Sequence, residues 1–244
     1  MKAIILAAGV GKRLYPLTRK MPKCMLKINK ETLIEQYFYS FSKCGINEVV
    51  LVVGHLNRII KETLDKKFKG VKIKYIYNKY YEVYGSAYSF WLTRKEFIES
   101  PIILLDSDVL FHPKILEKLV KSKHENCLIV DRSFVDTGEE VKVSVEGKTV
   151  KKLGKETVRS SNCVGENVGF YKFSENKYTV IREIMKFIKD YAFNFEYEDA
   201  INLSLDKLKM QYIPTKGLPW IEIDSPEDLH RAREDIYPKI IKHL

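Results

Sequence analysis

Two different periods of apolar residues alternate along the first half of the chain. Short apolar runs of strand length are separated by segments in which apolar residues recur at helical spacing, as Leu33, Tyr37 and Phe41 do. Strands are therefore predicted over residues 3–6, 48–53, 71–77, 102–105 and 127–130, and helices over 33–43, 56–68, 86–97 and 113–120. This alternation predicts a parallel sheet covered by helices. Ligands of such sheets bind beyond the carboxyl ends of the strands, here on the loops after residues 6, 53, 77 and 105.

The pattern changes after Val130. Two short β segments at 141–146 and 149–153 flank Gly147, which indicates a hairpin. Further strands are predicted over 168–173, 211–214 and 220–223, and helices over 178–189, 198–208 and 226–237. The sequence shows no repeat or linker, so we expect a single domain over 1–244, with a core at 1–130 and a second part at 131–244. The predicted class is α/β, with a Rossmann-like, mixed and mostly parallel sheet flanked by helices and a smaller β-containing lid.

Composition limits the class of protein and the compartment in which it is expected. The 244 residues are 45% hydrophobic, enough for a sizeable core. No apolar run reaches the roughly 18 residues of a membrane span, and Met1-Lys2 leads directly into a strand, so we expect neither membrane insertion nor a signal peptide. The four cysteines form no C-x-x-C pair, so neither zinc binding nor a disulfide framework is indicated, and the cytoplasm is the expected compartment.

The formal net charge of +10 admits two interpretations. One is a polyanionic partner, such as a nucleotide, a nucleic acid or an anionic membrane surface. The other is a lysine-rich, solvated surface. No recognition helix or aromatic RNA-binding strand is evident, so nucleic-acid binding is not expected.

A glycine-rich loop, residues 7–28, follows the first strand. Gly9 and Gly11 allow a sharp turn or a close approach to a ligand, while Lys12, Arg13 and Lys23 supply positive charge. Backbone N–H groups in such loops bind phosphates. The loop is neither a Walker P-loop, because Arg13 replaces the Ser/Thr, nor a Rossmann fingerprint, because the third glycine is missing.

Two pairs of carboxylates stand at predicted strand ends. Asp106 and Asp108 follow the strand at 102–105, and Glu222 and Asp224 recur near the C-terminus. In an extended chain, residues two apart point to the same side. Such oxygen ligands suit Mg²⁺. The alternative is that they are solvated turn residues.

The sequence LAAGVGKRL at 6–14, with PLT at 16–18 and PK at 22–23, closely resembles the signature of the sugar-phosphate nucleotidyltransferase superfamily. The resemblance implies the nucleotide-diphospho-sugar transferase fold and a reaction that joins a phosphate-bearing substrate to a nucleoside triphosphate with release of pyrophosphate. It implies that Arg13 binds the β- and γ-phosphates and that Lys23 stabilises charge at the α-phosphorus. The metal is expected on Asp108 with Glu222 or Asp224. The implied nucleotide-binding residues are Leu6, Ala7, Ala8, Gly9, Gly11, Lys12, Arg13, Asn78, Gly85, Ser86 and Asp106.

The base-reading segment is more similar to the cytidylyltransferase branch. Relatives that use dTTP or UTP carry a Gln followed by Gly-Leu-Ala, whereas this chain has Asn78 and then Gly85-Ser86-Ala87. Further segments at 131–132, 136–139, 153–155, 197–200 and 220–224 resemble the phosphocholine, 2-aminoethylphosphonate and inositol-1-phosphate enzymes. The expected substrates are therefore CTP and a small phosphorylated or phosphonate acceptor, in a chain compatible with oligomer formation.

An amino or ammonium acceptor needs an acidic or aromatic pocket. The expected acceptor-binding residues are Tyr88, Asp131, Lys155, Glu166, Tyr197 and Glu198. Alternatively, Tyr88 pairs with Trp91 in the core and Lys155 is a surface lysine. Two other functions remain open: a sugar-1-phosphate uridylyl- or thymidylyltransferase, and a non-catalytic nucleotide-binding module. Retention of Arg13, Lys23 and Asp108 argues against the second.

Overall fold

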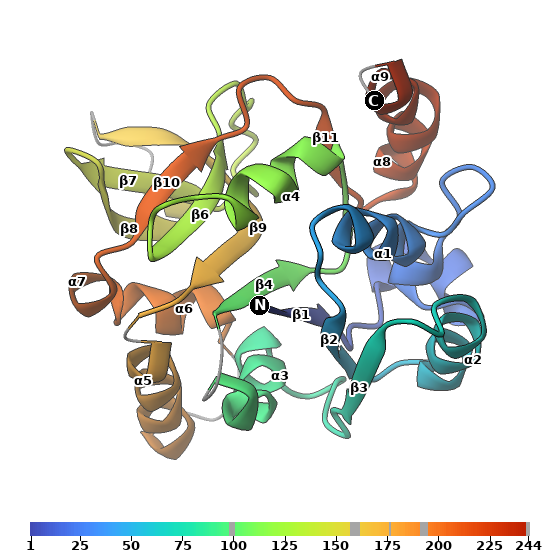
Figure 1. Cartoon of the computed structure of the whole chain (residues 1–244), viewed down its shortest axis with the longest axis horizontal. Helices are drawn as coiled ribbons and strands as arrows, with labels where there is room; N and C mark the ends of the chain where they lie inside the picture. Colours follow the sequence, from blue (N-terminus) through green and yellow to red (C-terminus); the bar gives the residue numbers. More distant parts are fainter. Residues whose placement is uncertain (98–100, 157–161, 176, 191–194, 243–244) are drawn as a thin grey trace.

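A nine-stranded sheet runs through the molecule in the order β3-β2-β1-β4-β9-β6-β10-β8-β7 (Figure 1). The computed structural model describes residues 1–97, 101–156, 162–175, 177–190 and 195–242. The first strands are β1 (Lys2–Ala7), β2 (Glu48–Val53), β3 (Lys72–Tyr77) and β4 (Ile102–Asp106), and they pair with one another in parallel. Ile4 of β1 lies between Val50 and Leu104, so the apolar runs stack in register.

The second half of the sheet is mainly antiparallel. It contains β6 (Asn126–Asp131), β7 (Lys142–Glu146), β8 (Thr149–Gly154), β9 (Cys163–Phe173) and β10 (Gln211–Pro214). The predicted hairpin around Gly147 is confirmed as β7 and β8. The long β9 joins the halves, because it pairs with β4 on one side and β6 on the other. The predicted α/β class with a mixed sheet is confirmed.

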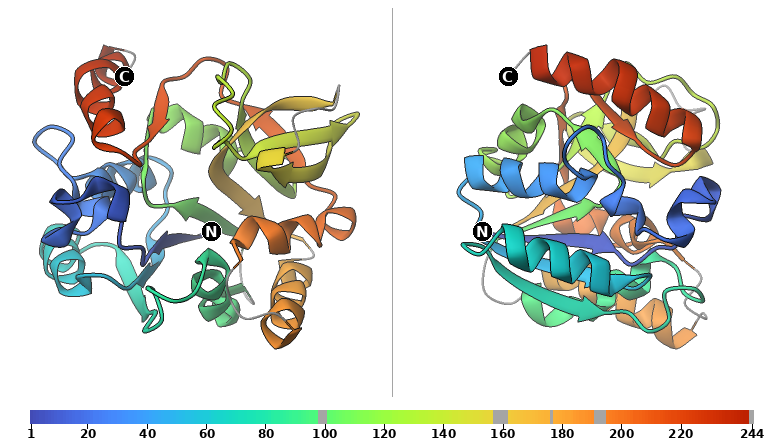
Figure 2. Two further views of the ribbon diagram at one scale, coloured as in Figure 1. Left: turned by 180° about the vertical axis from the view of Figure 1, so that it is seen from behind. Right: turned by 90° about the vertical axis from the view of Figure 1, so that its right-hand side faces the viewer.

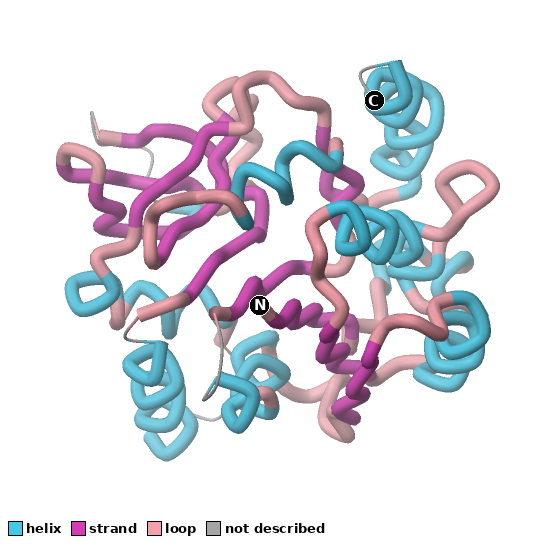
Figure 3. The backbone as a smooth tube through the Cα atoms, in the orientation of Figure 1, coloured by secondary structure: helices cyan, strands magenta, loops and turns pink. Residues whose placement is uncertain are grey.

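Helices cover both faces of the sheet (Figures 1 and 3). Apolar residues of α1 (Leu33–Lys43), α2 (Asn57–Lys67), α4 (Pro113–Val120) and α8 (Pro226–Arg231) pack in one core cluster. Residues of α3 (Ser86–Leu92), α5 (Lys177–Asp190), α6 (Tyr197–Asn202) and α7 (Leu205–Leu208) pack in the other. Helix α1 begins with a capping box in which the Thr32 backbone N–H donates to Glu35 Oε2 at 2.7 Å.

Three helices differ clearly from the sequence-based boundaries. The helix predicted over 86–97 ends at Leu92 and continues as a 3₁₀ turn, Arg94–Phe97, because the Thr93 hydroxyl donates to the Phe90 carbonyl. The helix predicted over 198–208 is split into α6 and α7. At the break, the Asn202 side chain turns to the backbone of Leu153. The closing helix extends beyond 237 through a π-helical turn, Ala232–Ile236, into α9 (Tyr237–Lys242).

A two-stranded ribbon and the C-terminal helices complete the edge that carries the loops. β11 (Trp220–Glu222) pairs antiparallel with β5 (Val109–Phe111). The C-terminal helices lie beside the glycine-rich loop (Figure 2), where the Arg233 guanidinium donates to the Lys27 carbonyl. Within the described part of the chain, no helix has both the length and the apolar character that crossing a bilayer requires.

Candidate functional site

A cleft of about 1130 Å³ opens at the carboxyl ends of β1 and β4. The glycine-rich loop, the loop 132–141 and residues of β9, β11 and α6 complete its walls. All predicted site residues line this cleft except Lys12 and Tyr88. The loops after Leu6, Tyr77 and Leu105 reach it as predicted, whereas no residue at 53–57 lines it.

The glycine-rich loop is held in one conformation by its own side chains. Gly11 has a φ of 67°, and a Cβ there would lie 3.3 Å from Lys23 Cβ. Thr18 Oγ1 donates to the Gly11 carbonyl at 2.7 Å. The ring of His55, just after β2, lies with Nε2 2.8 Å from the Thr18 carbonyl. The loop therefore presents Lys23 at a fixed position against the end of β4.

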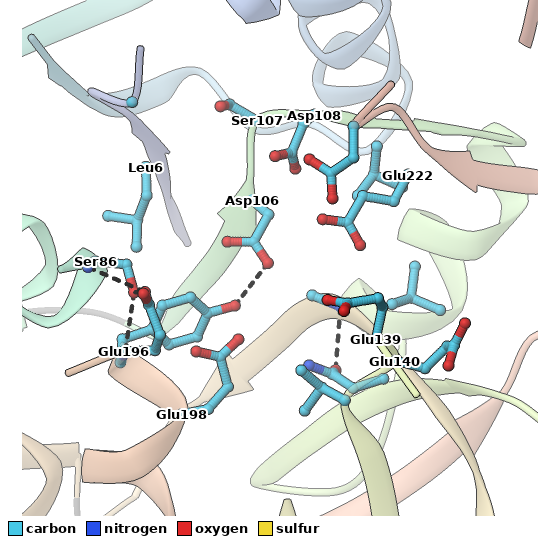
Figure 4. A pocket seen from close by; sticks show the side chains of 18 of the residues that line it. Leu6, Ser86, Asp106, Ser107, Asp108, Glu139, Glu140, Glu196, Glu198 and Glu222 are labelled. Carbon is cyan, nitrogen blue, oxygen red and sulfur yellow. Dashed lines mark hydrogen bonds between the residues drawn. The ribbon is translucent and has the colours of Figure 1, made fainter. Parts of the chain in front are cut away.

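Three carboxylates converge opposite this loop. Asp108, Glu222 and Asp224 each offer an oxygen, and these oxygens lie within 4.8 Å of one another. The ribbon brings them together, because Glu222 pairs with Val109 and the Ile223 N–H donates to the Asp108 carbonyl at 2.9 Å. Figure 4 shows Asp108 and Glu222 pointing into the same cavity as Asp106 and Glu198.

Lys23 bridges two of these carboxylates. Its Nζ lies 2.7 Å from Asp108 Oδ2 and 2.5 Å from Asp224 Oδ1. Arg13 Nη2 lies 2.6 Å from Asp224 Oδ2. Burial lowers the pKa of Lys23, but the two carboxylates raise it by more, so the ammonium stays charged. Burial raises the pKa of Asp224, and Lys23 and Arg13 bring it below its ordinary value.

The donor set fits a divalent cation. Asp108 Oδ1 is buried and has no hydrogen-bond partner among the residues that the structure describes. Burial, and then the charges of Asp108 and Asp224, raise the pKa of Glu222 well above its ordinary value. Carboxylate oxygens that converge in this way suit a hard cation such as Mg²⁺. Glu222 and Asp224 both belong to the cluster, so the geometry favours neither over the other.

The predicted base-reading residues are bonded within the protein. Asn78 is buried, with Nδ2 donating to Ser89 Oγ at 2.9 Å and Oδ1 accepting from the Tyr80 N–H at 2.8 Å. The Ser86 N–H and hydroxyl both donate to the Glu196 carboxylate. A Cβ at Gly85 would lie 2.3 Å from the Phe195 carbonyl oxygen. Asn78 and Gly85-Ser86 therefore shape the cleft wall and join it to α6.

The opposite part of the cleft is acidic. Tyr197 donates its hydroxyl to Asp106 Oδ2 at 2.7 Å. Burial, followed by the charges of Glu198 and Asp108, raises the pKa of Asp106 well above its ordinary value. Burial also raises the pKa of Glu198 to about 8. For Glu166, burial and then the neighbouring Glu140 and Asp131 raise the pKa to about 7.

Two predicted acceptor-binding residues have other partners. Asp131 accepts hydrogen bonds from Trp220 Nε1 at 2.8 Å and Thr215 Oγ1 at 3.0 Å, so it anchors the cleft wall. Lys155 Nζ lies 2.6 Å from Glu139 Oε2 in the loop 132–141, and both side chains are exposed.

Two predictions are corrected by position. Tyr88 does not line the cleft, because its ring stacks on Trp91 at a centroid distance of 5.6 Å and only 9% of the residue is exposed. The core alternative therefore holds for Tyr88. Lys12 is exposed in the 3₁₀ turn Lys12–Leu14 and also lies outside the cleft lining.

Several charged cleft residues were not among those predicted, and two of them come from the C-terminal helix α8. Asp228 and Arg231, both from α8, line the cleft beside Asp224. A sequence signal for them exists: Ser225 and Asp228 have the spacing of a capping box, and Arg231 lies three residues further on, on the same helix face.

The fold and this cleft define an α/β protein of the nucleotide-diphospho-sugar transferase type, with a glycine-rich loop facing a carboxylate centre. Residues 2–140 match the family model described as nucleotidyl transferase, and the chain belongs to that family. The predicted resemblance is thereby confirmed.

Its relatives include several cytidylyltransferases. The CTP:phosphoglutamine cytidylyltransferase of Campylobacter jejuni is 28% identical over 257 residues, covering 94% of this chain and 98% of the relative. The choline-phosphate cytidylyltransferase of Streptococcus pneumoniae is 33% identical over 148 residues, covering 59% of this chain and 62% of the relative. Among solved structures, the inositol-1-phosphate CTP transferase from T. maritima superposes with a TM-score of 0.81 at 26% identity, covering 99% of this chain and 95% of the other.

Proposed function

We propose that this protein transfers CMP from CTP to a small acceptor that carries a phosphate or phosphonate, with release of pyrophosphate and with Mg²⁺ as cofactor. The observation that carries the proposal is Lys23, which the glycine-rich loop holds between Asp108 and Asp224. The printed names of the relatives above support CTP as the nucleotide.

The mechanism follows from charge. An ionised oxygen of the acceptor attacks the α-phosphorus in line, a new P–O bond forms, and the bond to the β-phosphate oxygen breaks as pyrophosphate leaves. No general base is needed, because the nucleophile is already ionised. Arg13 holds the β- and γ-phosphates, and Lys23 offsets the charge that develops at the α-phosphorus.

Asp108, Glu222 and Asp224 would hold the Mg²⁺. When bound, the ion supplies positive charge against the triphosphate. The Arg13 side chain is 64% exposed and pairs with Asp224, so Mg²⁺ bound at Asp224 would release the guanidinium for the nucleotide.

The acidic part of the cleft favours an amino or quaternary ammonium acceptor. Asp106, Glu166 and Glu198 all face the cleft, and burial raises the pKa of each. A cation brought by the substrate would restore their charged forms, and the ring of Tyr197 adds an aromatic wall. Phosphocholine or 2-aminoethylphosphonate therefore suits this pocket better than the uncharged ring of inositol-1-phosphate.

We expect CTP to be preferred over UTP and dTTP. Cytosine offers an N4 donor and an N3 acceptor where uracil offers O4 and N3–H. A site that pairs with one edge leaves groups unpaired against the other, at about 1–3 kcal/mol for each unmade bond. The Asn78 amide is committed to Ser89 and Tyr80, so backbone groups of Ala7 and Ala8 are the better candidates for reading N4.

The test is pyrophosphate release across CTP, UTP, dTTP and GTP with phosphocholine, 2-aminoethylphosphonate, inositol-1-phosphate and glucose-1-phosphate. We expect the highest rate with CTP and an amine-bearing acceptor. Equal or higher rates with UTP or dTTP on glucose-1-phosphate would establish the sugar nucleotidyltransferase alternative. Nucleotide binding without turnover on any acceptor would establish a non-catalytic module.

A further inference from the structure

Positive charge is scarce in the cleft. Among the residues that the structure describes, twelve carboxylate side chains line it, against four cationic side chains: Arg13, Lys23, Lys155 and Arg231. Three of these cations are held in close ion pairs, at 2.6 Å for Arg13, 2.5 Å for Lys23 and 2.6 Å for Lys155. Arg231 differs, because its Nη1 lies 4.0 Å from Asp228 Oδ1 and its side chain is 63% exposed. Among the cleft cations in the described chain, Arg231 is the least committed.

The position of Arg231 is fixed by the carboxylate centre. Asp228 Oδ2 accepts hydrogen bonds from the N–H groups of Asp224 at 3.2 Å and Ser225 at 2.9 Å, and from the Ser225 hydroxyl at 2.8 Å. These bonds tie the first turn of α8 to Asp224, the same residue that holds Arg13. Arg231 lies one helical turn beyond Asp228, on the same side of α8. Asp224 therefore pairs with the Arg13 guanidinium and connects through Asp228 to the helix that carries Arg231.

We propose that Arg231 binds the terminal phosphates of the triphosphate and the departing pyrophosphate, together with Arg13. The inference rests on the proposed function only in taking a nucleoside triphosphate as the ligand. An exposed pair at 4.0 Å contributes little, so Arg231 leaves Asp228 at little cost. A guanidinium forms paired hydrogen bonds with phosphate oxygens. As the bond to the α-phosphorus breaks, charge accumulates on the pyrophosphate, and a second arginine there offsets it.

Calorimetry on the full chain with Mg²⁺ tests this. The dissociation constants of CTP, CMP and inorganic pyrophosphate are measured for the wild type, Arg231→Gln and Arg231→Lys. Lys242→Gln is the matched control, because Lys242 is exposed in α9 and does not line the cleft. Thermal unfolding of each variant verifies that α8 remains folded.

We expect Arg231→Gln to raise the dissociation constants of CTP and pyrophosphate about tenfold, the scale of one charge-assisted hydrogen bond. The dissociation constant of CMP should stay within about twofold of the wild-type value. Arg231→Lys should recover part of the loss, and Lys242→Gln should match the wild type. Unchanged pyrophosphate affinity in Arg231→Gln, an equal loss for CMP, or no pyrophosphate binding by the wild type would overturn the inference. If pyrophosphate binding falls in Arg231→Gln while the wild type shows no CMP transfer, the proposed function fails and this inference stands.

Discussion

Replacing Lys23 by methionine would test both the stability and the chemistry of the site. Methionine keeps most of the length of the side chain and removes the ammonium. Without it, Asp108, Glu222 and Asp224 face one another with Arg13 as their remaining close cation among the described residues. We expect the variant to be less stable without a divalent cation, and to recover most of that loss when Mg²⁺ is added.

The size of the loss follows from burial. Removing one partner of a buried ion pair costs about 3–5 kcal/mol. Lys23 is 14% exposed, but Asp108 and Asp224 are 22% and 27% exposed, and Arg13 still pairs with Asp224. Partial exposure and the remaining pair reduce the cost to about 2–3 kcal/mol. At roughly 2.1 cal/mol/K of unfolding entropy per residue, a chain of 244 residues should lose about 4–6 °C in melting temperature.

The assay is thermal unfolding in EDTA and in Mg²⁺, followed by steady-state kinetics. Lys20→Met serves as control, since Lys20 is an exposed lysine of the same loop. For chemistry, an interaction made mainly in the transition state predicts that kcat and kcat/KM fall together by about 10²-fold or more. An unchanged melting temperature in EDTA would refute the reasoning on stability. A variant that merely needed more CTP and kept its kcat would refute the role at the α-phosphorus.

Three further changes probe the centre and the acidic pocket. Asp108→Asn should abolish Mg²⁺-dependent turnover, because an amide lacks the charge that holds a hard dication; a rate titration with MgCl₂ that matched the wild type would place the metal elsewhere. Gly169→Ala should destabilise the fold by about 2–4 kcal/mol. Gly169 has a φ of 79°, a conformation that alanine adopts at a cost, and a Cβ there would lie 2.2 Å from Asp106 Oδ2, which would break the hydrogen bond from Tyr197 to Asp106. Gly147→Ala, with a φ of 61° and open space around it, should show only the conformational cost, and equal losses in the two variants would contradict the clash. Glu166→Gln should stabilise the protein by up to about 3 kcal/mol at pH 8 and not at pH 4. The wild-type carboxyl has a pKa raised from 4.5 to about 7, so its burial costs progressively more stability as pH rises between those values. A difference in melting temperature that did not change with pH would count against the burial of that charge.

Local patterns in the sequence predicted much of the sheet. The strand at 48–53 and the helix at 33–43 were both confirmed. Their apolar patterns reflect which side chains must face the core, and that requirement is visible in the local sequence. The 3₁₀ turns of the glycine-rich loop and the break between α6 and α7 were not predicted. They depend on tertiary hydrogen bonds, such as that from Thr18 to Gly11 and the two between Asn202 and Leu153, which no local period reports.

The same distinction between local and tertiary determinants applies to the site. A contiguous motif sufficed to predict Arg13 and Lys23, whose positions depend mainly on the loop. Convergence of Asp108 with Glu222 and Asp224 depends on the pairing of β5 with β11, elements more than a hundred residues apart, so the sequence left the second ligand undecided. Tyr88 lies against Trp91 outside the cleft lining, a position that the sequence left open because aromatic residues at helical spacing occur both in cores and in pockets.

The distribution of charge changes what the net charge implies. The chain carries +10, yet carboxylates outnumber cations in the cleft, so most of the positive charge lies on surfaces away from it. Ionised carboxylates in the cleft would oppose a bare triphosphate, and three of the four cations that line it in the described part of the chain are paired with its own carboxylates. Binding of a polyanion therefore requires cations to arrive from outside the chain or to be released within it. Mg²⁺ at Asp108, Glu222 and Asp224 would do both, since it would bring charge and free Arg13 and Lys23 for the phosphates. The ammonium group of an acceptor would likewise bring positive charge to Asp106 and Glu198. An acidic cleft is therefore consistent with a reaction between two anions.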